Sequence, residues 1–192
     1  MRKLVTVAVL VLALGVGATV YGSRGGGAAK PGPATPPTSA AGADDVAMVD
    51  QVLAGLDGVM GDLQRILVHD RKITTDVTDR LRAIYTGPEL LNQIDAFRAD
   101  VDGGLLGYKA TPGNRVTRVS RLITVSPICM FAEVKRDYSP ISVGLAPKAS
   151  TLYVVLVSKD DKEDPKHLNP TSWTMLYDGV QADGAQPEDI CR

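Results

Sequence analysis

The sequence predicts an α+β domain, in which three helices precede a curved antiparallel sheet of about four strands. The first half of the folded region has apolar residues at the three- and four-residue spacings of amphipathic helices. The second half has short segments rich in β-branched and aromatic residues, bounded by turn residues. These segments are Arg115–Val125, Ile128–Arg136, Thr151–Ser158 and Trp173–Asp178. Because the helices come before the strands and do not alternate with them, we expect an antiparallel sheet on which the helices pack.

A long amphipathic helix is expected from Asp44 to Val68. Its main apolar row consists of Val49, Leu53, Leu56, Met60, Leu63 and Leu67. Gly55, Gly58 and Gly61 lie three residues apart in it, although each glycine weakens a helix by about 1 kcal/mol relative to alanine. Their alignment indicates either the close approach of another element or plain surface glycines.

Two shorter helices follow the first. One begins at Thr75 or Asp76. The next has Thr86 and Glu89 at the spacing of a capping box, in which each side chain bonds to the backbone of the other residue, and a proline at its start. This third helix is expected to run to about Asp102, where two glycines end it.

The four strands differ in pattern. Arg115–Val125 alternates imperfectly, which predicts a bulge or a curved strand. Ile128–Arg136 alternates as a half-buried strand does, and Thr151–Ser158 is apolar on both faces, as in a central strand. In the last strand, Trp173, Met175 and Tyr177 alternate with Thr174 and Leu176.

The N-terminus has the pattern of an export signal. Three residues, two of them basic, precede an uncharged apolar run from Leu4 to Tyr21. Its length suits either a cleaved signal peptide or an uncleaved membrane anchor, so residues 1–21 are assigned to one of these. Residues 22–43 form a linker of Gly, Pro, Ala, Ser and Thr that we expect to be disordered. The domain of residues 44–192 then lies on the extracytoplasmic face of the membrane, or is secreted if the signal is cleaved.

The charge of the domain limits its partners. From Asp44 onward the chain has 17 basic and 22 acidic residues, a formal charge of −5. A net acidic domain argues against nucleic acid and anionic lipid as the main partner.

The two cysteines, Cys129 and Cys191, favour a disulfide in an exported chain. Such a bond ties the C-terminal tail to the second strand. Two free thiols or an intermolecular bridge are the alternatives.

Candidate site residues are few. Four aromatic residues are candidates for the lining of a pocket on the concave side of the sheet, or for ordinary core: Tyr85, Phe97, Tyr153 and Trp173. The acidic run from Asp160 to Asp164 is interleaved with lysines and favours a solvated hairpin tip over a calcium site. Both histidines, His69 and His167, are expected at the surface. No catalytic motif, metal-ligand spacing or cofactor-binding loop occurs in the sequence.

Three arginines recur every third residue along the first strand: Arg115, Arg118 and Arg121. On a strand they fall on alternating faces, so they do not form one anion-binding stripe. Because Glu133, Lys135 and Asp137 are expected opposite them, we expect cross-strand pairs.

The order of elements resembles the NTF2-like (cystatin-like cone) superfamily. The resemblance rests on the long first helix, the short helices around Ile84 to Glu89, and the W-x-x-x-Y spacing of Trp173 and Tyr177. The anchored N-terminus and linker are similar to those of actinobacterial Mce-associated envelope proteins and of exported domains of conjugation-type secretion channels. The resemblance implies a cone with a pocket between sheet and helices, and it assigns no catalytic residue.

These features favour a non-enzymatic protein-interaction module, tethered outside the cytoplasmic membrane. Its partner would be an envelope protein, or a second copy paired through the open face of the sheet. A small-molecule or lipid-binding pocket is the alternative. An enzyme of the SnoaL-like or ketosteroid-isomerase-like type is a third reading, and it requires a carboxylate or histidine of perturbed pKa at the bottom of an apolar pocket.

Overall fold

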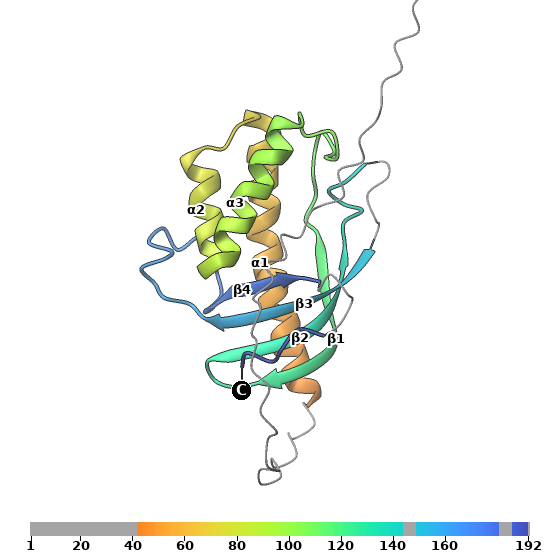
Figure 1. The fold of residues 1–192 in the computed structure, drawn as a ribbon, viewed down its shortest axis with the longest axis vertical. Helices are drawn as coiled ribbons and strands as arrows, with labels where there is room; N and C mark the ends of the chain where they lie inside the picture. Colours follow the sequence, from red (N-terminus) through yellow and green to blue (C-terminus); the bar gives the residue numbers. More distant parts are fainter. Residues whose placement is uncertain (1–41, 144–148, 181–185, 192) are drawn as a thin grey trace, which may run out of the picture.

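The computed structural model describes residues 42–143, 149–180 and 186–191. In this part of the chain, three helices pack on one face of a four-stranded antiparallel sheet, as shown in Figure 1. The helices are α1 (Ala43–Asp70), α2 (Thr75–Ile84) and α3 (Gly87–Asp102). The strands, which lie in the sheet in chain order, are β1 (Val116–Val125), β2 (Cys129–Asp137), β3 (Ala149–Ser158) and β4 (Trp173–Gly179). The predicted α+β class is confirmed, and the three helices and four strands predicted within the domain are present.

Helix α1 runs the length of the domain beside the sheet, and α2 and α3 gather at its C-terminal end (Figure 1). Its predicted apolar row is buried in the core between helices and sheet. Two of its three aligned glycines allow close contacts. A Cβ on Gly55 would lie 2.7 Å from a Thr171 methyl group, and one on Gly61 would lie 2.0 Å from the Asn114 side chain, whereas Gly58 faces open space.

The start of α3 differs from the prediction. Thr86 is the N-cap residue, with Pro88 in the first turn, but its side chain makes no capping hydrogen bond. The Thr86 hydroxyl donates instead to Glu163 of the β3–β4 loop at 3.0 Å. The Glu89 carboxylate accepts from Gln93 at 2.7 Å. The capping box is therefore absent, because both side chains have other partners.

Strand β1 contains the predicted irregularity, in the form of two bulges. Its register with β2 skips Ser120 and Ile123. Each extra residue shifts the alternation, so that Val119, Leu122 and Val125, three residues apart, all pack into the core on the helix side of the sheet. We call this side the inner face.

A third bulge changes β4. Its register with β3 skips Leu176. The simple alternation predicted from the sequence is therefore wrong beyond this residue. Trp173 and Met175 pack on the inner side, whereas Tyr177 joins the cluster on the opposite, outer face. The same shift turns the side chain of Asp178 inward.

The outer face of the sheet carries the C-terminal tail. Cys129 and Cys191 form a disulfide with their Cα atoms 5.5 Å apart, which is compatible with the pairing expected from the sequence. The tail also accepts a hydrogen bond at Asp189 from the hydroxyl of Thr124. Beneath it lies a second apolar cluster centred on Phe131, which is fully buried. This face of the sheet is therefore covered in part by the chain itself.

The expected signal or anchor (residues 1–21) and nearly all of the expected linker (residues 22–43) lie outside the described residues. None of the helices within residues 42–143, 149–180 and 186–191 combines the length and apolar character needed to cross a membrane.

Two of the three glycines of α1, Gly58 and Gly61, predict opposite effects of the same substitution. Gly58→Ala should raise the free energy of unfolding by about 0.5–1 kcal/mol, because alanine favours the helix and nothing obstructs its methyl group. Gly61→Ala should lower it by about 1–3 kcal/mol, because the methyl group must displace Asn114 from its 3.0 Å hydrogen bond with Arg65. Urea denaturation of both variants measures the difference, and an equal change in the two would contradict the close approach.

Candidate functional site

The four aromatic candidates do not line one pocket. Tyr85 and Phe97 are buried in the inner core and Trp173 packs against it. Tyr153 lies on the outer face, where its ring centroid is 6.0 Å from that of Phe131. The placement of Tyr153 corrects the expectation, since its β3 neighbours Leu152 and Val154 are the residues that point to the helices.

A buried group of charged and polar side chains crosses the inner face instead. We call it the ionic cluster, and its members are Asp57, Tyr85, Arg115, Thr117, Arg136 and Asp178. They come from α1, the residue after α2, the segment before β1, and strands β1, β2 and β4. The two arginines and two aspartates have no net formal charge, which is the condition for burying them together.

One half of the ionic cluster joins α1 to β1. The Asp57 carboxylate accepts from Arg115 Nε at 2.7 Å, from the backbone N–H of Thr117 at 2.7 Å and from the Thr117 hydroxyl at 3.1 Å. Both charged side chains are buried, at 6% and 5% exposure. These contacts fix the start of β1 against the middle of the helix.

The other half spans the sheet. Arg136 donates from Nη1 to both oxygens of Asp178, at 2.7 and 2.9 Å, and from Nε to the Thr117 hydroxyl at 2.9 Å. The Tyr85 hydroxyl donates to Asp178 at 3.0 Å. Burial acts to raise the pKa of Asp178, but the charges of Arg136 and Arg115 and the hydrogen bonds outweigh it, so the pKa lies below its ordinary value. An aspartate held ionised in this way is a poor proton acceptor at neutral pH.

The sequence reading missed this arrangement. The prediction that Arg115 pairs across the strands is wrong, because its side chain forms an ion pair with Asp57 of α1. Arg121 does pair with Glu133, at 3.2 Å, whereas Arg118 lies opposite Lys135. One signal was available, because Asp57 interrupts the apolar side of α1, and an acid at that position needs a buried cation.

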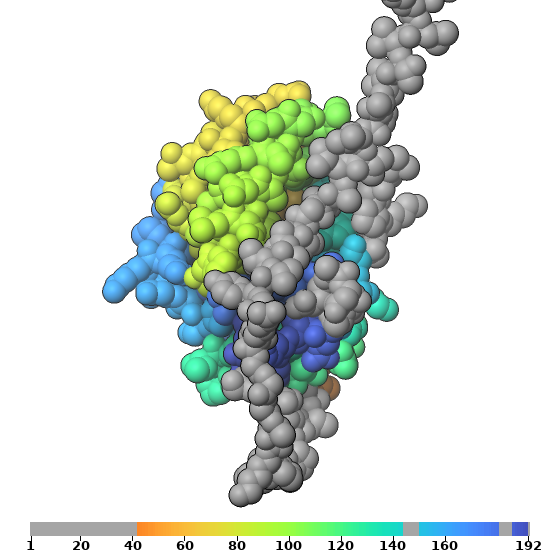
Figure 2. All heavy atoms as spheres, viewed as in Figure 1, coloured from red at the N-terminus to blue at the C-terminus, as the bar shows by residue number. Residues whose placement is uncertain are grey.

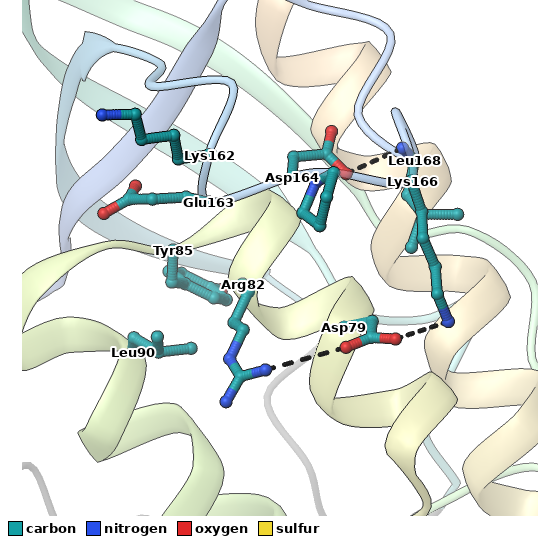
Figure 3. Close-up of a pocket in the computed structure, with 10 residues that line it drawn as sticks. Asp79, Arg82, Tyr85, Leu90, Lys162, Glu163, Asp164, Lys166 and Leu168 are labelled. Carbon is teal, nitrogen blue, oxygen red and sulfur yellow. Dashed lines mark hydrogen bonds and ion pairs between the residues drawn. The ribbon is translucent and has the colours of Figure 1, made fainter.

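A surface cavity of about 340 Å³ opens where α2, the start of α3 and the β3–β4 loop meet. We call it the corner pocket, and Figure 3 shows its walls. Its apolar lining comes mainly from Tyr85, Leu90, Pro165 and Leu168, and its charged lining from Asp79, Arg82, Lys162, Glu163, Asp164 and Lys166. In the space-filling view of Figure 2 the β3–β4 loop (light blue) lies directly against α2 (yellow).

The β3–β4 loop is held in shape by two buried polar residues. Asp164 is 2% exposed and accepts from the backbone of Leu168 and Asn169, at 2.9 and 3.0 Å, and from Lys159 at 3.2 Å. Asn169 donates to the carbonyl of Ala83 in α2 at 2.7 Å. The expectation of a solvated hairpin tip is therefore wrong for Asp164, whose buried carboxylate organises the loop.

Ion pairs tie the same loop to α2. Lys166 Nζ lies 2.6 Å from one oxygen of Asp79, and Arg82 Nη1 lies 3.8 Å from the other (Figure 3). A hydrogen bond with Asp79 raises the pKa of Lys166. Among the described residues, Lys162 has no ion-pair partner.

A second, smaller depression of about 180 Å³ lies over the α1–β1 junction and exposes the edge of the ionic cluster at Asp57 and Arg115. His69 is exposed and bonds to Asp70 at 2.8 Å, and His167 lies in the β3–β4 loop outside the corner pocket lining. Within residues 42–143, 149–180 and 186–191, no three His, Cys, Asp or Glu side chains are grouped as metal ligands.

Comparison of the chain with protein-family models, with curated proteins and with solved structures gives no significant match. The functional interpretation therefore depends on the geometry of the ionic cluster and the corner pocket.

The ionic cluster predicts a large effect of neutralising one aspartate. Asp178→Asn should lower the free energy of unfolding by about 3–5 kcal/mol at neutral pH, because Arg136 is left buried without its counter-charge. Asp95→Asn, which breaks the exposed pair with Arg98, should change it by less than about 1 kcal/mol. Denaturation curves of both variants measure the free energy of unfolding. Similar decreases in the two variants would show that the ionic cluster contributes no more stability than an exposed ion pair.

The same cluster predicts a dependence on pH. Because the pKa of Asp178 is lower in the folded state, its stabilising contribution is present above the ordinary aspartate pKa of about 3.9 and is lost as the pH falls towards the folded-state pKa. The stability difference between the natural protein and Asp178→Asn should therefore shrink on acidification from pH 6 to about pH 3. A constant difference across this range, measured by urea denaturation at each pH, would contradict the assignment.

Proposed function

We propose that this protein is an exported, membrane-tethered envelope protein whose α+β domain is a non-enzymatic protein-interaction module. The apolar N-terminal segment and the linker support the tether. The order of three helices and four antiparallel strands supports an NTF2-like cone. In this proposal the domain stands on the extracytoplasmic side of the membrane and binds another envelope protein.

The observation that carries the proposal is the corner pocket. It is a hollow on the surface, mostly apolar in its exposed lining, and the β3–β4 loop that forms one wall is fixed by Asp164 and Asn169. A preformed apolar hollow is a site where a partner side chain can be buried without first ordering the loop.

The interior of the domain favours binding over catalysis. In the NTF2-like enzymes implied by the resemblance, the pocket would lie between sheet and helices. Here the Asp178–Arg136 pair and the Tyr85 hydroxyl occupy part of that space. Asp178 is neutralised by two arginines, and its lowered pKa is the opposite of what a general base near neutrality requires.

A small-molecule binder is the second candidate, and the size of the corner pocket favours it. A cavity of about 340 Å³ lies at the lower end of the range for ligand sites. Mass spectrometry of the protein released gently from its own membranes would reveal a retained amphiphile.

Two neighbouring leucines of α3 provide a matched test. Leu90 lines the corner pocket, whereas Leu91 is 64% exposed and lies outside its lining. We expect Leu90→Lys to abolish partner capture, because a lysine in the apolar lining fills and charges it, and Leu91→Lys to leave capture intact. The measurement is crosslinking in the native envelope followed by affinity purification of the full chain, tagged within residues 22–43.

As a control, the thermal unfolding of each variant shows whether lost capture results from loss of folding. Should Leu90→Lys prove unstable, Pro165→Lys supplies an exposed lining position for the same comparison. Capture that is equal in the Leu90→Lys, Pro165→Lys and Leu91→Lys proteins would overturn the corner pocket as the docking site.

A further inference from the structure

The charge balance around the corner pocket differs from the net charge of the domain. Three cations, Arg82, Lys162 and Lys166, and the carboxylates of Asp79, Glu163 and Asp164 line the pocket. The carboxylate of Asp164 pairs with Lys159, and both of these side chains are buried. With Asp164 neutralised by Lys159, the rim of the pocket has one more cation than carboxylates, on a domain whose formal charge is −5.

Two of the cations retain the capacity to bind a carboxylate. The short contact of Asp79 is with Lys166, so its 3.8 Å contact with Arg82 is weak, and the Arg82 side chain is 56% exposed. Lys162 has no ion-pair partner within the described residues. An arginine in this state can donate two parallel hydrogen bonds to a carboxylate.

The floor of the pocket selects an apolar group. The hydroxyl of Tyr85 is turned inward to Asp178, and its ring, although only 1% of the residue is exposed, lines the pocket together with Leu90 and Leu168. A volume of about 340 Å³ holds one or two side chains and no folded element. The geometry therefore suits an extended segment of a partner that inserts an apolar side chain.

We propose that the corner pocket binds an acidic, extended segment of a partner protein. An apolar side chain of the segment lies on the floor formed by Tyr85, Leu90 and Leu168. Flanking Asp or Glu residues of the segment bind Arg82 and Lys162. This inference rests on the proposed interaction function and specifies the chemistry of the partner.

The test is selection of peptides from a random phage-displayed library on the immobilised full chain. Peptides that also bind the Leu90→Lys protein are removed. The expected result is enrichment of sequences with an aromatic or aliphatic residue flanked by Asp or Glu. Enrichment of basic or uncharged sequences, or no enrichment that depends on Leu90, would overturn the inference.

A matched pair of arginines then tests the rim. Arg82 and Arg98 are both exposed on helices and both pair with an aspartate three residues before them, but only Arg82 lines the pocket. Arg82→Glu should weaken binding of the best selected peptide about tenfold or more, and Arg98→Glu should not change it by more than about twofold. Fluorescence anisotropy measures both, and binding should weaken at high salt. Equal effects of the two substitutions would contradict recognition by the rim.

Failure of this inference can be told apart from failure of the proposed function. Envelope-partner capture that is lost in Leu90→Lys but kept in Arg82→Glu would retain the docking site and overturn the acidic partner. Partner capture that is unaffected by either substitution would overturn both the docking site and the acidic partner. Light scattering of the full chain tests whether a second copy occupies the pocket. A dimer that dissociates in the Leu90→Lys protein would show a second copy as the occupant and overturn the acidic partner.

Discussion

The pairing of Arg136 with Asp178 is the contact on which the arrangement of the domain depends. It connects the second strand to the fourth across the inner face, and Tyr85 and Thr117 attach the end of α2 and the first strand to the same two charges. Through Arg115 and Asp57 the chain of contacts reaches α1. Buried charges are tolerated only when each has its counter-charge in place, so the cluster specifies one relative position of helix and sheet.

Backbone irregularities make this pairing possible. Without the bulge at Leu176, simple alternation would direct Tyr177 inward and leave Asp178 on the outer face. The two bulges of β1 act in the same way for apolar residues, because they keep positions three residues apart on one face. The bulges therefore decide which side chains reach the interior and also curve the sheet around α1.

The charged and polar side chains of the domain lie in the interior at the ionic cluster and at the surface around the corner pocket. Asp178 and its partners lie inside, with balanced charge, and bind the elements to one another. Asp164 and Asn169 hold a loop at the surface, and that loop forms one wall of a hollow whose rim has both cations and carboxylates. Tyr85 connects the two, since its hydroxyl belongs to the cluster and its ring to the pocket.

The sequence alone determined the α+β class, the seven elements and the buried row of α1, because apolar spacing and turn residues are local signals. It did not reveal the partners of Arg115, Arg136 and Asn169, which lie far apart in the chain and meet only after folding. Imperfect alternation indicated the irregularity of β1, whereas the bulge at Leu176 in β4 had no such signal and defeated the alternation predicted for that strand. The tertiary structure therefore decided both the buried cluster and the corner pocket, because each is assembled from side chains on separate elements.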